Sequence, residues 1–245
     1  MIRLAQREDH DRFLEILGKA PFFAAEMDAA WNTCTRDLFF FADERAVLWL
    51  HGGRAMLYGP LTNTQEMSEF LAFQRIECLQ SMDWIPPDFE PEEQWILEYL
   101  PSSARHWKCP NGYFVDQQPI LYQAATACIT PDVTNVPADE WAAQACARRN
   151  KCGADIWALK KQNEYAAIAG IFAMTSHEAY IAGVVTAREH RREGCASYLV
   201  TSLARQYSSC NRTVRLVCRK PMIPFYEKFG FVPKVRIWQS KRRSE

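Results

Sequence analysis

Hydrophobic and polar residues come in blocks along the second half of the chain, and these blocks predict a succession of strands and helices. Residues 154–160 and 166–174 are apolar runs separated by the polar residues 161–164, a turn of hairpin length. Residues 179–185 form a third run that is apolar throughout, as expected of a strand buried on both faces. After it, apolar residues at helical spacing predict an amphipathic helix: Leu199, Val200, Leu203, Ala204 and Tyr207.

Further elements extend this pattern on both sides. We expect a strand at residues 120–128 and a helix at residues 137–149, where a proline and two acids stand at the start, as helices prefer. Residues 213–219 alternate in character and predict another strand. A short helix at residues 222–229 and a last strand at residues 232–239 close the chain. Such a mixture is typical of a layered α/β (α+β) fold.

The first half of the chain has a similar beginning. Helices are expected at residues 9–18 and 23–32, and three short apolar runs within residues 38–59 predict a β-meander. Residues 63–81 carry apolar positions at intervals of three and four and predict one long amphipathic helix. Residues 95–99 are consistent with either a strand or a short helix.

A stretch rich in turn residues separates the two halves. Prolines and the Asn111-Gly112 pair between residues 101 and 119 mark the expected boundary. With 245 residues and 48% hydrophobic content, the chain is long enough for two domains of ordinary size. We therefore predict an N-terminal α+β domain at residues 1–115 and a second domain at residues 116–245.

A basic turn joins the strand at residues 179–185 to the helix that follows. His190, Arg191 and Arg192 come just before Gly194, and small residues open the helix. The first N–H groups of a helix have no intrahelical partner and the helix dipole places partial positive charge there, so an anion can bind. The residues predicted to form this phosphate-sized site are Arg191, Arg192, Glu193, Gly194, Cys195, Ala196 and Ser197.

Three motifs in this half are similar to those of one protein family. The spacing Arg191-x-x-Gly194-x-Ala196 resembles the acyl-CoA signature of the GNAT superfamily of N-acyltransferases. Residues 183–186, Gly-Val-Val-Thr, precede it as in one branch of that superfamily, and residues 225–231 resemble its second hallmark, a tyrosine followed by Gly-Phe. The resemblance covers roughly residues 121–240.

The resemblance implies a fold and a cosubstrate. The superfamily's fold is a mixed, mostly antiparallel sheet flanked by helices, in which two neighbouring strands splay apart to admit the pantetheine arm. The cosubstrate would be acetyl-CoA or another acyl-CoA, with no metal. Because the first half begins like the second but has no arginine-glycine turn, it is expected to be a degenerate GNAT-like module in a tandem arrangement. An unrelated α+β domain is the alternative.

The resemblance also implies residue roles. Backbone N–H groups at Val184, Val185 and Thr186 would polarise the thioester carbonyl if the strand bulges there. Tyr226 would be the acid that protonates the leaving thiolate, although a packed core tyrosine is the simpler alternative. As a general base, Glu178 lies about 26 Å from the turn end of its strand, which argues against it.

Composition narrows the functional classes. Lys+Arg and Asp+Glu both count 29, so no net field draws the chain to nucleic acid or anionic membranes. The nine cysteines are scattered without a Cys-x-x-Cys pair, which indicates a reducing, cytoplasmic compartment and no zinc site. No apolar run reaches eighteen residues, and no signal peptide is visible at the start, so we expect no membrane association.

The sequence thus favours an N-acetyltransferase that acts on a primary amine of a small molecule or peptide by direct attack in a ternary complex. Two alternatives stay open: a GNAT-fold module that binds CoA without turnover, and a transferase that uses aminoacyl-tRNA. The neutral charge balance counts against the second alternative. The sequence carries no prediction of acceptor identity, acyl chain length or oligomeric state.

Overall fold

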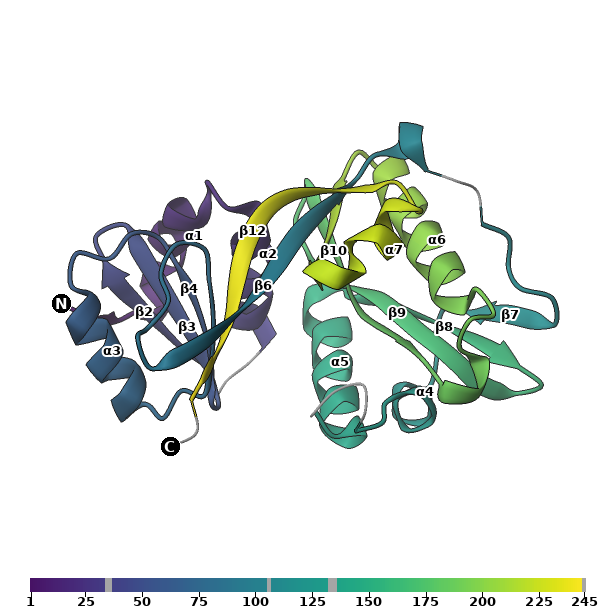
Figure 1. The fold of residues 1–245 in the computed structure, drawn as a ribbon, viewed down its shortest axis with the longest axis horizontal. Coiled ribbons are helices and arrows are strands. Elements are labelled where there is room, and N and C mark those ends of the chain that lie inside the picture. Colours follow the sequence, from purple (N-terminus) through teal and green to yellow (C-terminus); the bar gives the residue numbers. More distant parts are fainter. Residues whose placement is uncertain (34–36, 105–106, 132–135, 244–245) are drawn as a thin grey trace. The chain divides into compact units, whose positions relative to one another are not determined.

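The computed structural model describes residues 1–33, 37–104, 107–131 and 136–243, and it shows two compact units (Figure 1). The first unit consists of Met1–Ile96, Cys218–Ile223 and Pro233–Glu245. The second consists of Leu97–Val217 and Pro224–Val232. Because the units interleave along the chain, they are a different division from the domains at residues 1–115 and 116–245, which remain a prediction.

The first unit has a meander packed between helices. Its elements are β1 (Arg3–Leu4), α1 (His10–Leu17), α2 (Pro21–Thr33), β2 (Leu38–Asp43), β3 (Ala46–His51), β4 (Arg54–Tyr58), α3 (Thr64–Phe73) and β5 (Cys78–Ser81). Strands β1 to β4 pair antiparallel in chain order, and β5 lies parallel to β4. Buried side chains from β3, β4, α3 and β5 form one core, which includes Leu48, Leu57, Leu71 and Leu79.

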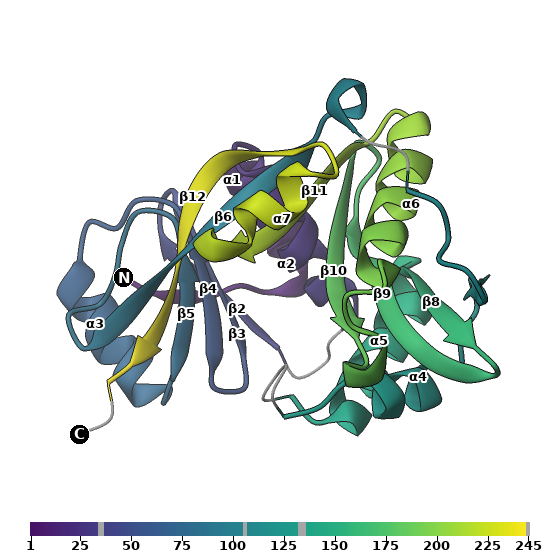
Figure 2. The same cartoon turned by 45° about the vertical axis from the view of Figure 1, so that its right-hand side comes forward.

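The second unit repeats this order of elements. It contains β7 (Tyr113–Asp116), α4 (Leu121–Cys128), α5 (Ala138–Cys152), β8 (Asp155–Lys161), β9 (Glu164–Met174), β10 (Glu178–Thr186), α6 (Cys195–Ser209), β11 (Thr213–Arg219) and α7 (Ile223–Glu227). The last two residues of β11 and the first residue of α7 belong to the first unit. Strands β7 to β10 pair antiparallel, and β11 lies parallel to β10. Helices α4 and α5 cover one face of this sheet, and α6 lies on the other (Figure 2). The mostly antiparallel sheets between helices confirm the expected fold class.

Two long strands contribute residues to both units. Strand β6 (Phe89–Tyr99) belongs to the first unit up to Ile96, and its last residues belong to the second unit, where β6 is the neighbour of β11. Strand β12 (Phe231–Arg242) begins in the second unit and continues from Pro233 in the first, where it pairs antiparallel with β5. The sheet of the first unit is therefore completed by β12, which comes from the end of the chain.

Two predicted elements are wrong. Residues 120–128 form helix α4 instead of a strand, because Leu121, Ala124, Ala125 and Cys128 are buried at helical spacing and alanine strongly favours a helix. Residues 63–81 do not form one long helix. Helix α3 ends at Phe73, Arg75 has a φ of 54°, and the next residues form β5 with alternate burial.

The remaining predicted helices and strands are present with shifted ends. Residues 95–99, left between two alternatives by the sequence, are the end of strand β6. In the part of the chain that the structure describes, no helix has both the length and the apolar character needed to cross a membrane.

Candidate functional site

Strand β10 carries a bulge at the start of the residues predicted to polarise a carbonyl, Val184, Val185 and Thr186. Ala182 lies opposite Gly170 and Val185 lies opposite Ile168, so Gly183 and Val184 together face a single residue of β9. A bulge of this kind takes N–H groups out of the ladder. The bulge on which the predicted role of residues 184–186 depends is therefore present.

Only glycine fits at the first bulge position. Gly183 has a φ of 62°, and a Cβ there would lie 2.8 Å from a ring carbon of Phe172 and 3.1 Å from one of Trp141. The rings of Phe172 and Trp141 meet edge to face with centroids 5.6 Å apart and close the space beneath the bulge. The bulge is therefore held by packing as well as by backbone geometry.

Strands β10 and β11 part just before the bulge. Their parallel pairs run from Glu178 opposite Thr213 to Ile181 opposite Leu216, and the described residues beyond Ile181 show no further pair. Val184 and Thr186 are partly exposed, whereas Val185 is buried. The part of β10 that contains the bulge thus has one free edge inside the sheet, as the family resemblance implies.

The basic turn follows directly. Arg191, Arg192 and Glu193 are exposed, and Nε of Arg191 donates to the Thr186 carbonyl oxygen at 3.3 Å, which ties the turn to the end of β10. Gly194 stands at the N-cap of α6 with a φ of 88°. The positive φ of Gly194 is available to glycine at little cost.

The N-terminus of α6 offers unbonded N–H groups. The first helical bond runs from the Tyr198 N–H to the Gly194 carbonyl oxygen, so the N–H groups of Cys195, Ala196 and Ser197 precede it. Among the described residues, no side chain caps this end of α6. The arrangement suits an anion, because the N–H groups, the helix dipole and the nearby arginines all favour negative charge.

The equivalent helix of the first unit is closed to an anion. Helix α3 also connects two parallel strands, β4 and β5, but the Asn63 side chain accepts from the Glu66 N–H at 2.9 Å and caps it. The carboxylate of Glu66 in the first turn adds negative charge where an anion would have to bind. The first unit therefore keeps the topology of the site without its binding chemistry.

Cys195 is a buried thiol at the start of α6. Burial raises the pKa of the Cys195 thiol, and this effect outweighs the opposite influence of the nearby Tyr113 hydroxyl. Since the thiolate is the nucleophilic form, Cys195 is unsuited to covalent catalysis.

Tyr226 lies on α7 within an aromatic cluster. The ring centroid of Tyr226 is 5.0 Å from that of Phe225 and 6.1 Å from that of Phe231, and the residue is 9% exposed. The ring is thus packed as the simpler alternative requires, which leaves the acid role a prediction that a substitution can test.

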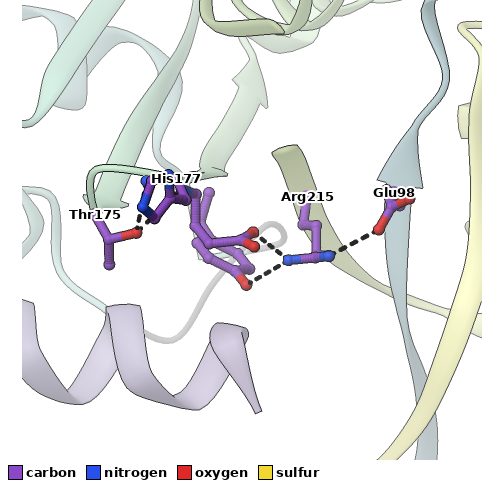
Figure 3. Close-up of polar contacts among 6 residues, drawn as sticks. Glu98, Thr175, His177 and Arg215 are labelled. Carbon is purple, nitrogen blue, oxygen red and sulfur yellow. Dashed lines mark hydrogen bonds and ion pairs between the residues drawn. The ribbon is translucent and has the colours of Figure 1, made fainter. Parts of the chain in front are cut away.

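Glu178 is part of an ion-pair network at the other end of β10. Figure 3 shows Arg215 between two carboxylates: its guanidinium pairs with Glu178, and its Nη2 donates to Oε2 of Glu98 at 2.8 Å. Burial disfavours the charged guanidinium, but hydrogen bonds to Glu178 and Tyr180 raise the pKa of Arg215 above its ordinary value. Because Glu178 neutralises Arg215, a structural role agrees with the earlier argument against Glu178 as a base.

Tyr113 lies beside the basic turn, although no sequence pattern connects it with the turn. Its hydroxyl donates to Oε2 of Glu193 at 2.5 Å and lies 2.8 Å from Nδ1 of His190. Burial and the bond to Glu193 raise the pKa of Tyr113, and the same bond lowers the pKa of Glu193. Tyr113 lies about eighty residues before the turn, so no local pattern connects them.

In the described residues, no group of three or more His, Cys, Asp or Glu side chains is arranged to hold a metal ion.

Comparison with known proteins identifies the class of the second half. Residues 119–231 match the Acetyltransferase (GNAT) family, and this part of the chain is a GNAT domain. No curated protein sequence matches the chain significantly.

Solved structures extend the similarity of fold to the whole chain. A tandem GNAT protein from the clavulanic acid biosynthesis pathway has a TM-score of 0.64 at 12% identity, with 100% of this chain and 99% of that chain covered. A GCN5-related N-acetyltransferase from Kribbella flavida has a TM-score of 0.63 at 15% identity over 92% and 96% of the two chains. One from Sphaerobacter thermophilus has a TM-score of 0.65 at 12% identity over 100% and 96%. The chain thus has a tandem GNAT fold.

The burial of Cys195 predicts its reactivity. With iodoacetamide at neutral pH, Cys195 should react slowly and the exposed Cys146 and Cys210 quickly, because burial raises the pKa of Cys195 and blocks access to it. Mass spectrometry of the labelled peptides over time measures the three rates, with unfolded protein as the control in which all three react. Labelling of Cys195 in the folded protein as fast as that of Cys210 would contradict the buried, unreactive state of the Cys195 thiol.

Proposed function

We propose that the protein is an N-acyltransferase that transfers an acyl group, most simply acetyl, from acyl-CoA to a primary amine of a small-molecule or peptide acceptor. The observation that carries the proposal is the uncapped N-terminus of α6, with its left-handed Gly194, directly after a bulged strand whose parallel neighbour has parted from it. The eight described cysteines are all free thiols, which fits a reducing compartment, and we place the reaction in the cytoplasm.

The cosubstrate would bind through its phosphates and its thioester. The pyrophosphate would accept hydrogen bonds from the N–H groups of Gly194, Cys195 and Ala196, and Arg191 and Arg192 would add positive charge. The pantetheine arm would enter where β10 and β11 part, since the unpaired edge of β10 offers it hydrogen bonds. The N–H groups of Val184, Val185 and Thr186, in and after the bulge, would then face the thioester carbonyl.

The chemistry is one addition and one elimination at the thioester carbon. The amine nitrogen forms a bond to the carbonyl carbon, the N–H groups of the bulge stabilise the negative oxygen, and the C–S bond then breaks. The nitrogen loses one proton and the departing sulfur gains one. Tyr226 is the proposed donor to sulfur.

Ordinary acidities limit what a tyrosine can do in this step. A phenol has a pKa of about 10 and a thiol one of about 8.5, so transfer from phenol to thiolate is uphill by about 2 kcal/mol. The transfer is complete only if the phenolate recovers a proton, and the ammonium formed by attack of the amine is the source that the reaction itself provides. Tyr226 would thus carry a proton from nitrogen to sulfur.

Ligand binding tests the cosubstrate. Acetyl-CoA should stabilise the protein by about 2.7 kcal/mol at a hundredfold excess over its Kd, and desulfo-CoA should do nearly as well. Gly194→Glu should abolish this stabilisation, because it places a negative charge where the phosphates would bind. Gly194→Asn is the matched control, since asparagine tolerates a positive φ without adding charge. Melting curves that do not respond to either ligand would contradict the assignment.

Substitution of Tyr226 tests the acid. Tyr226→Phe removes one oxygen and keeps the packed ring, so turnover should fall by about a hundredfold to ten-thousandfold while acetyl-CoA affinity stays unchanged. An acyl donor with a better leaving thiolate needs less protonation and should recover part of the lost rate. Steady-state kinetics with matched good and poor leaving groups make the measurement. Turnover within a few-fold of the parent enzyme would assign Tyr226 to the core instead.

A further inference from the structure

The phosphate-sized turn is attached to the rest of the second unit through the side chain of Glu193. Oε2 of Glu193 accepts from the Tyr113 hydroxyl at 2.5 Å and from Nζ of Lys161 at 3.4 Å. Because the single hydroxyl proton of Tyr113 goes to Glu193, its 2.8 Å contact with Nδ1 of His190 requires the imidazole to donate there. One tyrosine from strand β7 thus bonds to residues on both sides of Arg191 and Arg192.

The turn has backbone angles that do not favour its own sequence. Arg192 has a φ of 67° and Gly194 a φ of 88°, so Glu193 stands between two left-handed residues. Glycine adopts such angles freely, but for an arginine they are strained and persist only where surrounding contacts hold them. The bonds of Glu193 and His190 to Tyr113 are contacts of this kind on either side of Arg192.

The segment that carries Tyr113 also lies against the start of α6. A Cβ at Gly194 would be 3.9 Å from Cγ of Pro110, an ordinary van der Waals contact. The Tyr113 N–H donates to the Pro110 carbonyl oxygen at 3.1 Å, so Pro110 and Tyr113 belong to one turn. Tyr113 is 8% exposed, and its ring packs edge to face on His190 with centroids 5.6 Å apart.

The charge of Glu193 makes its direction important. A free carboxylate in this turn would repel the phosphates proposed to bind at the N–H groups of residues 194–196. The bonds from Tyr113 and Lys161 hold the carboxylate toward β7 and β8 and neutralise it in part. The same contacts that stabilise the shape of the turn therefore also remove an obstacle to an anion.

We propose that Tyr113 is a positioning residue for CoA: through Glu193 and His190 it holds the turn at residues 190–194 in the shape that binds phosphate. The inference rests on the proposed function. Tyr113 lies outside the residues that match the GNAT family, which begin at 119, so this support comes from a part of the chain that the family match does not include. Tyr113 itself does not touch the reacting atoms in this account.

Tyr113→Phe tests the proposal, with Tyr207→Phe as the matched control. The hydroxyl of Tyr207 donates to Oδ2 of Asp155 at 2.9 Å, so both variants lose one bond from a tyrosine to a carboxylate, but Tyr207 lies near the far end of α6. Calorimetry should show about a tenfold higher Kd for CoA in Tyr113→Phe, the loss expected for one hydrogen bond to a charged group, and the parent Kd in Tyr207→Phe. The KM for acetyl-CoA should rise by a similar factor, with kcat unchanged.

A double-mutant cycle separates positioning from general loss of stability. In the Glu193→Ala background the Tyr113→Phe substitution should have a smaller effect on the Kd than in the parent, because only the His190 contact of the hydroxyl is left to lose. Glu193 is exposed, so Glu193→Ala should fold. Two results would overturn the positioning role of Tyr113 alone: a parent Kd in Tyr113→Phe, or an undiminished effect of Tyr113→Phe in the absence of Glu193. Failure of the parent protein to bind CoA would overturn the proposed function and, with it, the positioning role of Tyr113.

Discussion

The early end of the pairing between β10 and β11 is the constraint on which the second unit depends. Backbone N–H and C=O groups in a sheet must be bonded or reach water, and among the residues that the structure describes no strand pairs with the inner edge of β10 past Ile181. The bulge at Gly183 and Val184 lies in this part of the strand, and the basic turn follows the end of the strand at Thr186. The bulged strand and the N-terminus of α6 together leave several backbone N–H donors without a backbone acceptor. The proposed cosubstrate would supply acceptors through its thioester carbonyl and its phosphates.

The two units show how one topology can keep or lose this chemistry. In both, a parallel pair of strands is connected through a helix: β4, α3 and β5 in the first unit, and β10, α6 and β11 in the second. Asn63 and Glu66 supply the first helix with an internal cap and a negative charge, whereas Gly194 leaves the second helix open. A few groups at the helix start therefore distinguish the first unit from the proposed binding site of the second.

The parts of this account that the sequence predicts are local ones. The run at residues 179–185, the glycine after two arginines and the helical spacing from Leu199 all lie within about thirty residues, and the structure contains each element. Residues 120–128 were predicted as a strand because a short apolar run is compatible with either a strand or a helix, and their alanine content favours the helix that the structure shows. For residues 63–81 the prediction merged helix α3 and strand β5 into one helix, because no sequence pattern indicates the left-handed conformation of Arg75 between them. The sequence did not predict a role for Tyr113, because its partner Glu193 is 80 residues further along the chain. Contacts at such a separation appear only in the folded structure.

The most direct test of the central claim is a crystal structure of the protein with acetyl-CoA or desulfo-CoA bound. The account predicts pyrophosphate density within hydrogen-bond distance of the N–H groups of Gly194, Cys195 and Ala196, and the pantetheine arm along β10 between Ala182 and Thr186. Density for the cofactor against the start of α3 in the first unit, or with its phosphates away from the start of α6, would contradict it.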